Sequence, residues 1–473
     1  MHRQDFTRAC TPDSSCGAGR RPWARGAWVG VILLSAAACS GLLEVDRPDI
    51  VEPDNLTSPA GLAAARAGAF GEFAKTFGGD ASAPGDVREN HVLVSGLLSD
   101  EFKALETDAT RIVYDARRIA SNTPNGNLER FYLDLHRARQ GAETAISLFT
   151  DAQPANADTV LAEMNSLAGF VVTFLGENYC SGVPVSTLTL DGNIEYSQPL
   201  TTVQLFELAE TRFAESLTRA QAANNATLQQ LARVGRARAL LNLGRHADAA
   251  TAVAGVPTSF SYLVRYSAST PRQNNGVWYS NNQLRRWSMD NRKGINGIDY
   301  MDAFTAGDPR TPWARMPGDG FGFDRSAGPG FVQLKYPTNT SSIPLATGIE
   351  ARLIEAEAAL KAGDVTTFDN IHNALRATLA TAAVGPVSTA GMTTVQRENY
   401  HFRERALWLY ATGHRLGDMR RLIRQYGRTQ ETVFPTGAYY RPVYPTYGNE
   451  VNLPVPTTEL NNPNFTGCVN RNA

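Results

Sequence analysis

The chain has 473 residues, of which 42% are hydrophobic and 19% charged, and its formal net charge at pH 7 is −1. This near-neutral balance excludes a general nucleic-acid binder, because such a protein needs excess basic charge to displace counterions from phosphates. The length exceeds one small core and predicts about two or three domains. No apolar run inside the chain reaches the roughly 18–20 residues that span a bilayer.

The N-terminal segment has the pattern of an export signal. A cluster of arginines precedes the apolar run 28–38, which ends in three alanines directly before Cys39. A basic region, a short apolar run and small residues before the cleavage point are the features of a cleaved signal. Because small residues before a cysteine resemble a lipobox, we expect a lipoprotein signal peptide over 1–38, a lipidated Cys39 and a polar tether over 39–57. Plain secretion, with Cys39 as an incidental thiol, is the alternative.

Helical periodicity begins near Ser58, which is a typical N-cap residue. The other stretches with this periodicity span 127–150, 158–179, 202–222, 227–243, 246–254, 348–362, 366–382 and 394–426. Strand signals are few and short. The sequence therefore predicts a mainly α fold.

Three of these stretches place a small residue seven positions before a glycine. The pairs are Gly169 and Gly176, Ala237 and Gly244, and Ala356 and Gly363. A small residue two turns before a glycine at a helix end lets a partner helix approach closely while the chain reverses. The spacing is typical of tetratricopeptide hairpins, although chance similarity among alanine-rich helices is the alternative for each pair.

The segment 257–347 differs from the rest of the chain. It is rich in glycine, proline, asparagine and aromatic residues, which predicts long irregular loops with a few short strands. Loops of this length are uncommon in compact domains and are often functional.

The stretch 394–426 predicts one long helix with an apolar stripe. The stripe consists of Phe402, Ala406, Leu409, Gly413 and Leu416. A glycine inside a helix costs about 1 kcal/mol relative to alanine, so Gly413 indicates a closely packed neighbour. Asp418 can pair with Arg415 or Arg421, three residues away on either side. These features favour a structural role for the helix over a catalytic one.

Two cysteines remain outside the predicted signal and lipidation site. They are Cys180 and Cys468, and an even pair in an exported protein is a disulfide candidate. Two unrelated buried thiols are the alternative.

The C-terminal stretch "RERALWLYATGHRLGDMRRL" resembles the ERxxELxxEGxRxxDLxR helix of the SusD/RagB family of outer-membrane nutrient-binding lipoproteins. Other pieces are similar to that family in the same order along the chain, namely "LLEVDRP", "GLLSDEF", "FLGENYCSGVPV", "GDPR", "IEARLIEAEAALKAGD" and "NLPVPTTELNNPNF". The chain departs from the family pattern in its weak lipobox and in the missing Arg-Tyr start before "IEARLIEAEA".

The resemblance implies a SusD-like α-α superhelix of tetratricopeptide-like hairpins with a loop-rich, ligand-facing region. On this basis the family domain covers 58–473, with 257–347 as a loop-rich insert and 348–473 as the C-terminal part. The family binds nutrients without turning them over, so the resemblance implies no enzyme activity, no cofactor and no metal.

The resemblance also implies partners and a location. The protein would bind an oligosaccharide, starch among the possibilities, or a peptide, and deliver it to a SusC-type TonB-dependent transporter. It would lie at the surface of the outer membrane, with the lipid anchor as its only contact with the membrane.

Glycans are bound by flat aromatic faces together with side chains that hydrogen-bond hydroxyl groups. The residues of this kind that we select are Trp278, Tyr279, Trp287, Trp313, Asn281 and Arg310. The alternative is that these aromatic side chains anchor long loops onto the helical scaffold. Asp100 and Glu101 could also reach a ligand, although the N-terminal turn of a helix favours acidic residues in any case.

Two other classes of function stay open. A periplasmic tetratricopeptide-type scaffold would bind a peptide or helix in a concave groove, and a glycoside hydrolase would bring two carboxylates together in a cleft. The sequence has no P-loop and no G-x-S-x-G elbow, and its seven histidines show no metal-ligand spacing.

Overall fold

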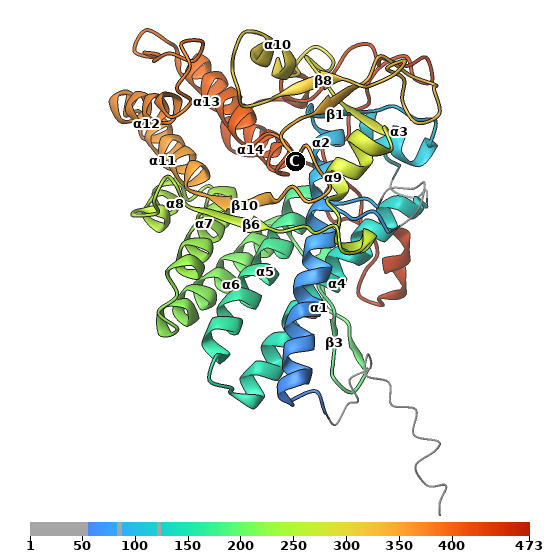
Figure 1. Cartoon of the computed structure of the whole chain (residues 1–473), viewed down its shortest axis with the longest axis vertical. Helices are drawn as coiled ribbons and strands as arrows, with labels where there is room; N and C mark the ends of the chain where they lie inside the picture. Colours follow the sequence, from blue (N-terminus) through green and yellow to red (C-terminus); the bar gives the residue numbers. More distant parts are fainter. Residues whose placement is uncertain (1–54, 83–87, 121–123) are drawn as a thin grey trace, which may run out of the picture. The chain divides into compact units, whose positions relative to one another are not determined.

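A stack of helices forms one layer of the molecule (Figure 1). The computed structural model describes residues 55–82, 88–120 and 124–473, so the predicted signal peptide, Cys39 and most of the tether lie outside the described residues. The helices of the stack are α1 (Pro59–Gly78), α4 (Gly126–Ala152), α5 (Ala157–Asn178), α6 (Thr202–Ala222), α7 (Ala226–Asn242), α8 (His246–Val253), α11 (Gly348–Ala362) and α12 (Val365–Ala377). Helices that follow one another in this series pack together, from α4 on α5 to α11 on α12. This arrangement confirms the mainly α fold of tetratricopeptide-like hairpins.

Local sequence signals set the helix ends. Thr201 and Gln204 form a capping box at the start of α6, in which each side chain bonds the backbone N–H of the other. Gly363 ends α11 in the left-handed conformation, with φ of 74°, and Gly244 has the same φ after α7. The predicted chain reversals at these two glycines are confirmed.

The glycine pair in α5 acts differently from the prediction. Gly176 does not end the helix, because α5 continues to Asn178. A Cβ atom at Gly176 would lie 2.7 Å from the ring of Phe206, and one at Gly169 would lie 2.9 Å from the ring of Phe213. Both phenylalanines belong to α6. The close helix approach is therefore confirmed, whereas the predicted helix end at Gly176 is wrong.

The helix α5 is the core helix of the stack. It is the one described helix long and apolar enough to span a membrane, with a mean hydropathy of 1.4, but 94% of that window is buried inside the protein. Its apolar surface is thus covered by neighbouring helices, as the hydrophobic effect requires of a core element.

A second, loop-rich layer covers one end of the stack (Figure 1). Its helices are α2 (His91–Leu98), α3 (Ala109–Asp115), η2 (Pro271–Gln273), α9 (Gly276–Trp278), η3 (Tyr279–Gln283) and α10 (Tyr300–Thr305). Its strands form two antiparallel pairs, β1 (Phe102–Ala104) with β7 (Trp287–Met289) and β8 (Trp313–Arg315) with β9 (Phe331–Gln333). The irregular segment leaves and rejoins the stack at one place, where β6 (Ser261–Val264) pairs antiparallel with β10 (Ile343–Thr347).

The two layers share a hydrophobic core. One cluster of buried residues includes Phe73 and Phe174 from the stack together with Phe102 and Trp287 from the other layer. The loops are therefore fixed to the helices through side chains that exclude water.

The predicted long helix over 394–426 is wrong in one respect. The structure divides it into α13 (Thr394–Trp408) and α14 (Arg415–Tyr426). Ala411 and Gly413 between them have φ of 55° and 78°, which a right-handed helix cannot contain. A Cβ atom at Gly413 would lie 2.4 Å from Cδ2 of His91. The predicted close neighbour of Gly413 is confirmed and is His91, but Gly413 lies in a turn and not inside a helix.

The C-terminal tail runs back along the stack. After α15 (Gln430–Val433) and the 3-10 helix η4 (Thr457–Asn461), the predicted disulfide joins Cys468 to Cys180, 288 residues apart. Short strands follow Cys180: β2 (Val183–Pro184) pairs with β5 (Pro199–Leu200), and β3 (Thr187–Leu188) pairs with β4 (Ile194–Glu195).

Candidate ligand-binding surface

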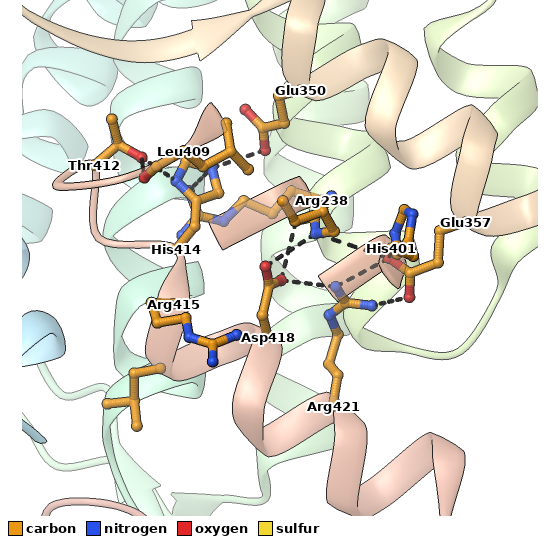
Figure 2. Close-up of polar contacts among 12 residues, drawn as sticks. Arg238, Glu350, Glu357, His401, Leu409, Thr412, His414, Arg415, Asp418 and Arg421 are labelled. Carbon is orange, nitrogen blue, oxygen red and sulfur yellow. Dashed lines mark hydrogen bonds and ion pairs between the residues drawn. The ribbon is translucent and has the colours of Figure 1, made fainter. Parts of the chain in front are cut away.

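Buried ion pairs attach α13 and α14 to the helical stack (Figure 2). Arg421 of α14 bonds Glu357 of α11 and donates a hydrogen bond of 2.7 Å to Asp418. Arg405 of α13 donates two hydrogen bonds, of 2.9 and 3.0 Å, to the same Asp418. Burial acts to raise the pKa of Asp418, but the two guanidinium groups pull that pKa well below its usual range. The predicted pairing of Asp418 with Arg421 is confirmed within a larger network.

The histidines of this region belong to the same packing. Nε2 of His414 lies 3.1 Å from Glu350, and Nε2 of His401 lies 3.3 Å from Glu357. Burial lowers the pKa of His401, even though Glu357 acts in the opposite direction, so this imidazole is neutral at pH 7. The described part of the chain contains no group of three or more His, Cys, Asp or Glu residues placed to hold a metal ion.

Ion pairs also fix the loop-rich layer to α13 and α14. Arg415 donates hydrogen bonds of 2.7 and 2.8 Å to Asp100. The sequence had offered Asp418 as its partner. Arg310, from the "GDPR" segment, bonds Asp308 beside it and Glu404 of α13. Asp100 is fully buried and Arg310 is 7% exposed, so both side chains hold the layers together in this structure.

Two further residues that we selected from the sequence are buried. The Trp287 ring lies 4.1 Å from the Phe102 ring and is 1% exposed. Asn281 donates to the carbonyls of Trp287 and Phe331, and its own carbonyl accepts from the Gln333 N–H. These contacts are those of loop anchors, which was the alternative interpretation of the sequence.

The other three selected residues are half-buried. Trp313 donates from Nε1 to the Met301 carbonyl, and its ring meets the Phe331 ring edge-on. Trp278 and Tyr279 lie at the junction of α9 and η3. The six selected side chains therefore do not form one exposed platform.

A different set of aromatic side chains is exposed on the loop-rich layer. Phe321, Phe323 and Tyr440 are 40%, 46% and 38% exposed, and Tyr444 is half-buried. We call these four residues the aromatic surface. They come from two loops, 317–330 and 437–446, far apart in the sequence.

Hydrogen bonds and close packing fix the loop 317–330 to the residues beneath it. Asp324 accepts hydrogen bonds from the backbone N–H and the hydroxyl of Thr107, at 2.5 and 2.6 Å. The N–H of Phe323 donates to the Arg285 carbonyl. A Cβ atom at Gly322 would lie 2.1 Å from the Leu105 carbonyl oxygen, so glycine lets the loop lie directly on the strand end beneath it.

The second loop is attached to the same region. The Tyr440 hydroxyl donates to Asp115, at 2.7 Å, and to the Ala104 carbonyl. Arg441 bonds the Glu106 carbonyl and donates to the Ser326 hydroxyl at 3.2 Å. The Arg441–Ser326 contact joins the two loops that carry the four aromatic residues.

Cations lie against the rings of the aromatic surface. The guanidinium carbon of Arg286 is 3.8 Å from the centre of the Phe323 ring, and that of Arg118 is 5.1 Å from the Tyr444 ring. Arg118 also lines a hollow of about 290 Å³ beside α3. The surface thus combines apolar ring faces with N–H donors, which suits a ligand that has both C–H and hydroxyl groups.

The sequence contained a signal for these residues. In "GDGFGFDRSAGPG" the phenylalanines alternate with glycines, and "AYYRPVYPTYG" is dense in tyrosine. A large apolar side chain flanked by glycines in a polar loop has few neighbours to bury it. Three of the six residues selected from the sequence are tryptophans, of which Trp287 is buried and Trp278 and Trp313 are half-buried.

Comparison with solved structures identifies the fold. A SusD superfamily protein from Bacteroides fragilis is similar with a TM-score of 0.63 at 16% identity, over 87% of this chain and 99% of that one. A SusD superfamily protein from Bacteroides thetaiotaomicron is similar with a TM-score of 0.62 at 15% identity, over 88% of this chain and all of that one, 100%. The chain has the SusD fold.

Another protein with this fold is the surface glycan-binding protein A from Bacteroides uniformis, similar with a TM-score of 0.61 at 12% identity over 86% of this chain and 98% of that one. No protein-family model and no curated protein matches the sequence. At these identities the likeness lies in the SusD fold, and the aromatic surface is described from this chain alone.

Proposed function

We propose that the protein is a lipid-anchored, glycan-binding protein of the outer membrane that captures an oligosaccharide on the aromatic surface. In this proposal it binds the ligand without cleaving it and delivers it to a SusC-type TonB-dependent transporter. The observation that carries the proposal is the exposed aromatic surface on the SusD fold.

The chemistry of the surface favours a glycan over a peptide as the ligand. Phenylalanine and tyrosine rings cover the C–H faces of pyranose sugars, and neighbouring guanidinium groups donate hydrogen bonds to hydroxyls. Phe323 offers one ring face to solvent while Arg286 covers the other. An extended peptide would instead use an unpaired strand edge or a groove for a helix.

The proposed location rests on the N-terminal sequence. Small residues before Cys39 support lipidation, and two or more acyl chains hold a protein stably at a bilayer. A similar protein of the same fold is described as a surface glycan-binding protein. The transporter partner follows from the sequence resemblance.

The test is direct binding. We would titrate the purified protein with a panel of oligosaccharides and of peptides by isothermal calorimetry, and then repeat the titration with the variants Phe321→Ala and Phe323→Ala. Because stacking on an aromatic face contributes on the order of 1 kcal/mol or more, we expect each variant to weaken glycan binding about fivefold or more. The control is Tyr196→Ala, which removes an exposed aromatic ring, 45% exposed, on another part of the protein.

The results separate the alternatives. Glycan binding that is unchanged in both phenylalanine variants contradicts the proposed site. Binding of peptides alone contradicts the proposed ligand class. Release of shorter sugars during the titration, detected by chromatography, contradicts binding without turnover.

A further inference from the structure

Arg420 and Arg424 of α14 differ from three nearby arginines that are paired with carboxylates. Arg405, Arg415 and Arg421 each bond a carboxylate. Arg420, by contrast, is fully buried, and its one hydrogen bond to another described residue is from Nη1 to the Gly176 carbonyl, at 2.8 Å. Its Nε and Nη2 have no hydrogen-bond partner among the described residues.

Arg424 follows one turn later on the same face of α14. Its Nη2 donates to Asn242 at 3.3 Å, its guanidinium lies over the Phe206 ring, and its Nη1 has no partner among the described residues. No described carboxylate lies within ion-pair distance of Arg420 or Arg424. Such buried charges are costly when they lack a counter-ion.

A cavity of about 560 Å³ lies beside these residues. Its lining comes from the end of α14, from the start of α15 and from the C-terminal tail: Ile423, Arg424, Gln430, Asn449, Glu450, Val451, Arg471, Asn472 and Ala473. None of the residues of the aromatic surface lines it.

Charged groups of both signs lie around this cavity, and Arg424 is the lining cation without an ion pair to a described carboxylate. Arg471 pairs with Glu450, which balances those two lining residues. Arg117 donates to two lining residues, Gln430 and the Glu450 carbonyl, and adds a further cation beside the cavity. Arg424 and Arg420 are two more cations at or beside the cavity.

The pKa values agree with the lack of a directly paired carboxylate. Burial lowers the pKa of Arg420 and the charge of Arg424 lowers it further, while Glu177 acts in the opposite direction and Arg471 adds to the lowering. Burial and then Arg421 lower the pKa of Arg424 to about 10, against the opposing charge of Glu177. An anion in the cavity would reverse these effects, because an opposite charge favours the protonated guanidinium.

We propose that this cavity is a binding site for a small anion, with Arg424 as the residue that contacts it and Arg420 as the buried charge behind it. The ligand chemistry is a carboxylate or a tetrahedral oxyanion, which a guanidinium group recognises with paired N–H donors. Two sources share this chemistry, a free inorganic anion and the acidic group of a sugar acid. The cavity volume admits both.

The experiment measures thermal unfolding of the purified protein with about 10 mM sodium sulfate, phosphate, galacturonate or galactose, at an ionic strength held constant with sodium chloride. A ligand that binds only the folded state stabilises it in proportion to the logarithm of its concentration over Kd. We expect at least one anion to raise the Tm by about 1–2 °C, and galactose, which is neutral, to leave it unchanged. A response to sulfate and phosphate assigns the site to inorganic anions, and a response to galacturonate assigns it to sugar acids.

Variants separate this site from general salt effects, since sulfate stabilises most proteins by exclusion from their surface. Arg424→Gln should weaken binding of the anion that raises the Tm about tenfold or more, as measured by calorimetry. Arg245→Gln, which breaks an exposed ion pair with Asp248, should leave this affinity unchanged. Arg420→Met removes an unbalanced buried charge, so we expect a higher Tm without anion and a smaller response to anion. Equal anion responses in wild type and Arg424→Gln, or no response to any anion, would overturn the proposal.

Discussion

Arg415 donates two hydrogen bonds to Asp100 across 315 residues of sequence, and both side chains are buried. This pair joins the turn after α2 to the first turn of α14. Tyr300 donates to the same carboxylate at 3.1 Å, and so does the backbone N–H of Ile298. Burial acts to raise the pKa of Asp100, but Arg415 and these hydrogen bonds lower it below its usual value.

Removing one partner of this pair should destabilise the fold strongly. We expect Asp100→Asn to lower the free energy of unfolding by about 3 kcal/mol, because it leaves a buried guanidinium without a counter-ion. The double variant Asp100→Leu with Arg415→Met should lose less than the sum of the single variants. Urea unfolding checks both, with the exposed pair Arg292–Asp302 as control, where Asp302→Asn should change little. Additive losses would show that the two residues do not act as a pair.

The turn between α13 and α14 should accept only glycine at position 413. Gly413→Ala places a Cβ atom 2.4 Å from His91 and imposes a φ of 78° on alanine. We expect a loss of about 2 kcal/mol or more in the free energy of unfolding. Gly427→Ala is the matched control, because its φ is 64° but no atom lies within 4 Å of the added Cβ. If the two variants are equally stable, then contact with His91 does not constrain the turn.

Glu101 should make the stability depend on pH. Burial raises its pKa from 4.5 to about 8, opposed by the hydrogen bond from the Ala411 N–H, while the charges of Asp100, Arg415 and Lys335 also act on it. The folded protein therefore keeps this proton where the unfolded chain has lost it, so the contribution to stability is complete below pH 4.5 and is lost as the pH rises through 8.

The neutral variant Glu101→Gln lacks this dependence. Relative to this variant, the wild-type protein should lose on the order of 1–3 kcal/mol between about pH 5 and pH 9. Denaturant titrations at several pH values measure the difference. The exposed Glu195→Gln on β4 should give a difference that does not change with pH. A constant gap for Glu101→Gln would mean that Glu101 is ionised throughout.

The disulfide should stabilise the folded chain and fix its tail. Joining residues 288 apart restricts the unfolded chain, and loss of a native disulfide typically costs about 2–5 kcal/mol. We expect Cys468→Ser to lower the Tm and to increase amide hydrogen exchange in 452–473, where Asn470 and Leu453 bond the segment around Cys180. A matched substitution of a neighbouring polar residue, Asn464→Ser, should have a smaller effect. Unchanged exchange in the tail would show that backbone contacts alone hold it.

Local patterns were sufficient to predict the helices of the stack, but not the short helices of the loop-rich layer such as α2 and α3. The stack follows from apolar periodicity and from caps such as Thr201 and Gly363, which act within a few residues. The break after α13 was missed because the apolar stripe continues across it, and the strain at Gly413 depends on His91, distant in sequence. Likewise, the composition of 317–330 does not reveal that Arg285 and Thr107 hold this loop with its rings outward.

The region of the candidate surface was predicted only in part, because Phe321 and Phe323 lie in the segment 257–347 whereas Tyr440 and Tyr444 lie outside it. Aromatic residues of the loop-rich segment were expected to meet the ligand, but burial is decided by tertiary contacts that composition does not encode. The Trp287 ring packs against the Phe102 ring of β1, whereas the outer face of the Phe323 ring stays exposed to solvent. The sequence therefore predicts the kind of side chain at such a site better than it predicts the residue.

The anchoring of loop 317–330 through Asp324 and Thr107 has a consequence for how such a protein changes over time. Because the hydrogen bonds between Asp324 and Thr107 do not involve the exposed rings, those side chains can change while the anchor of the loop persists. Under the proposed function, a change of ligand would then require new side chains at a few positions of this loop.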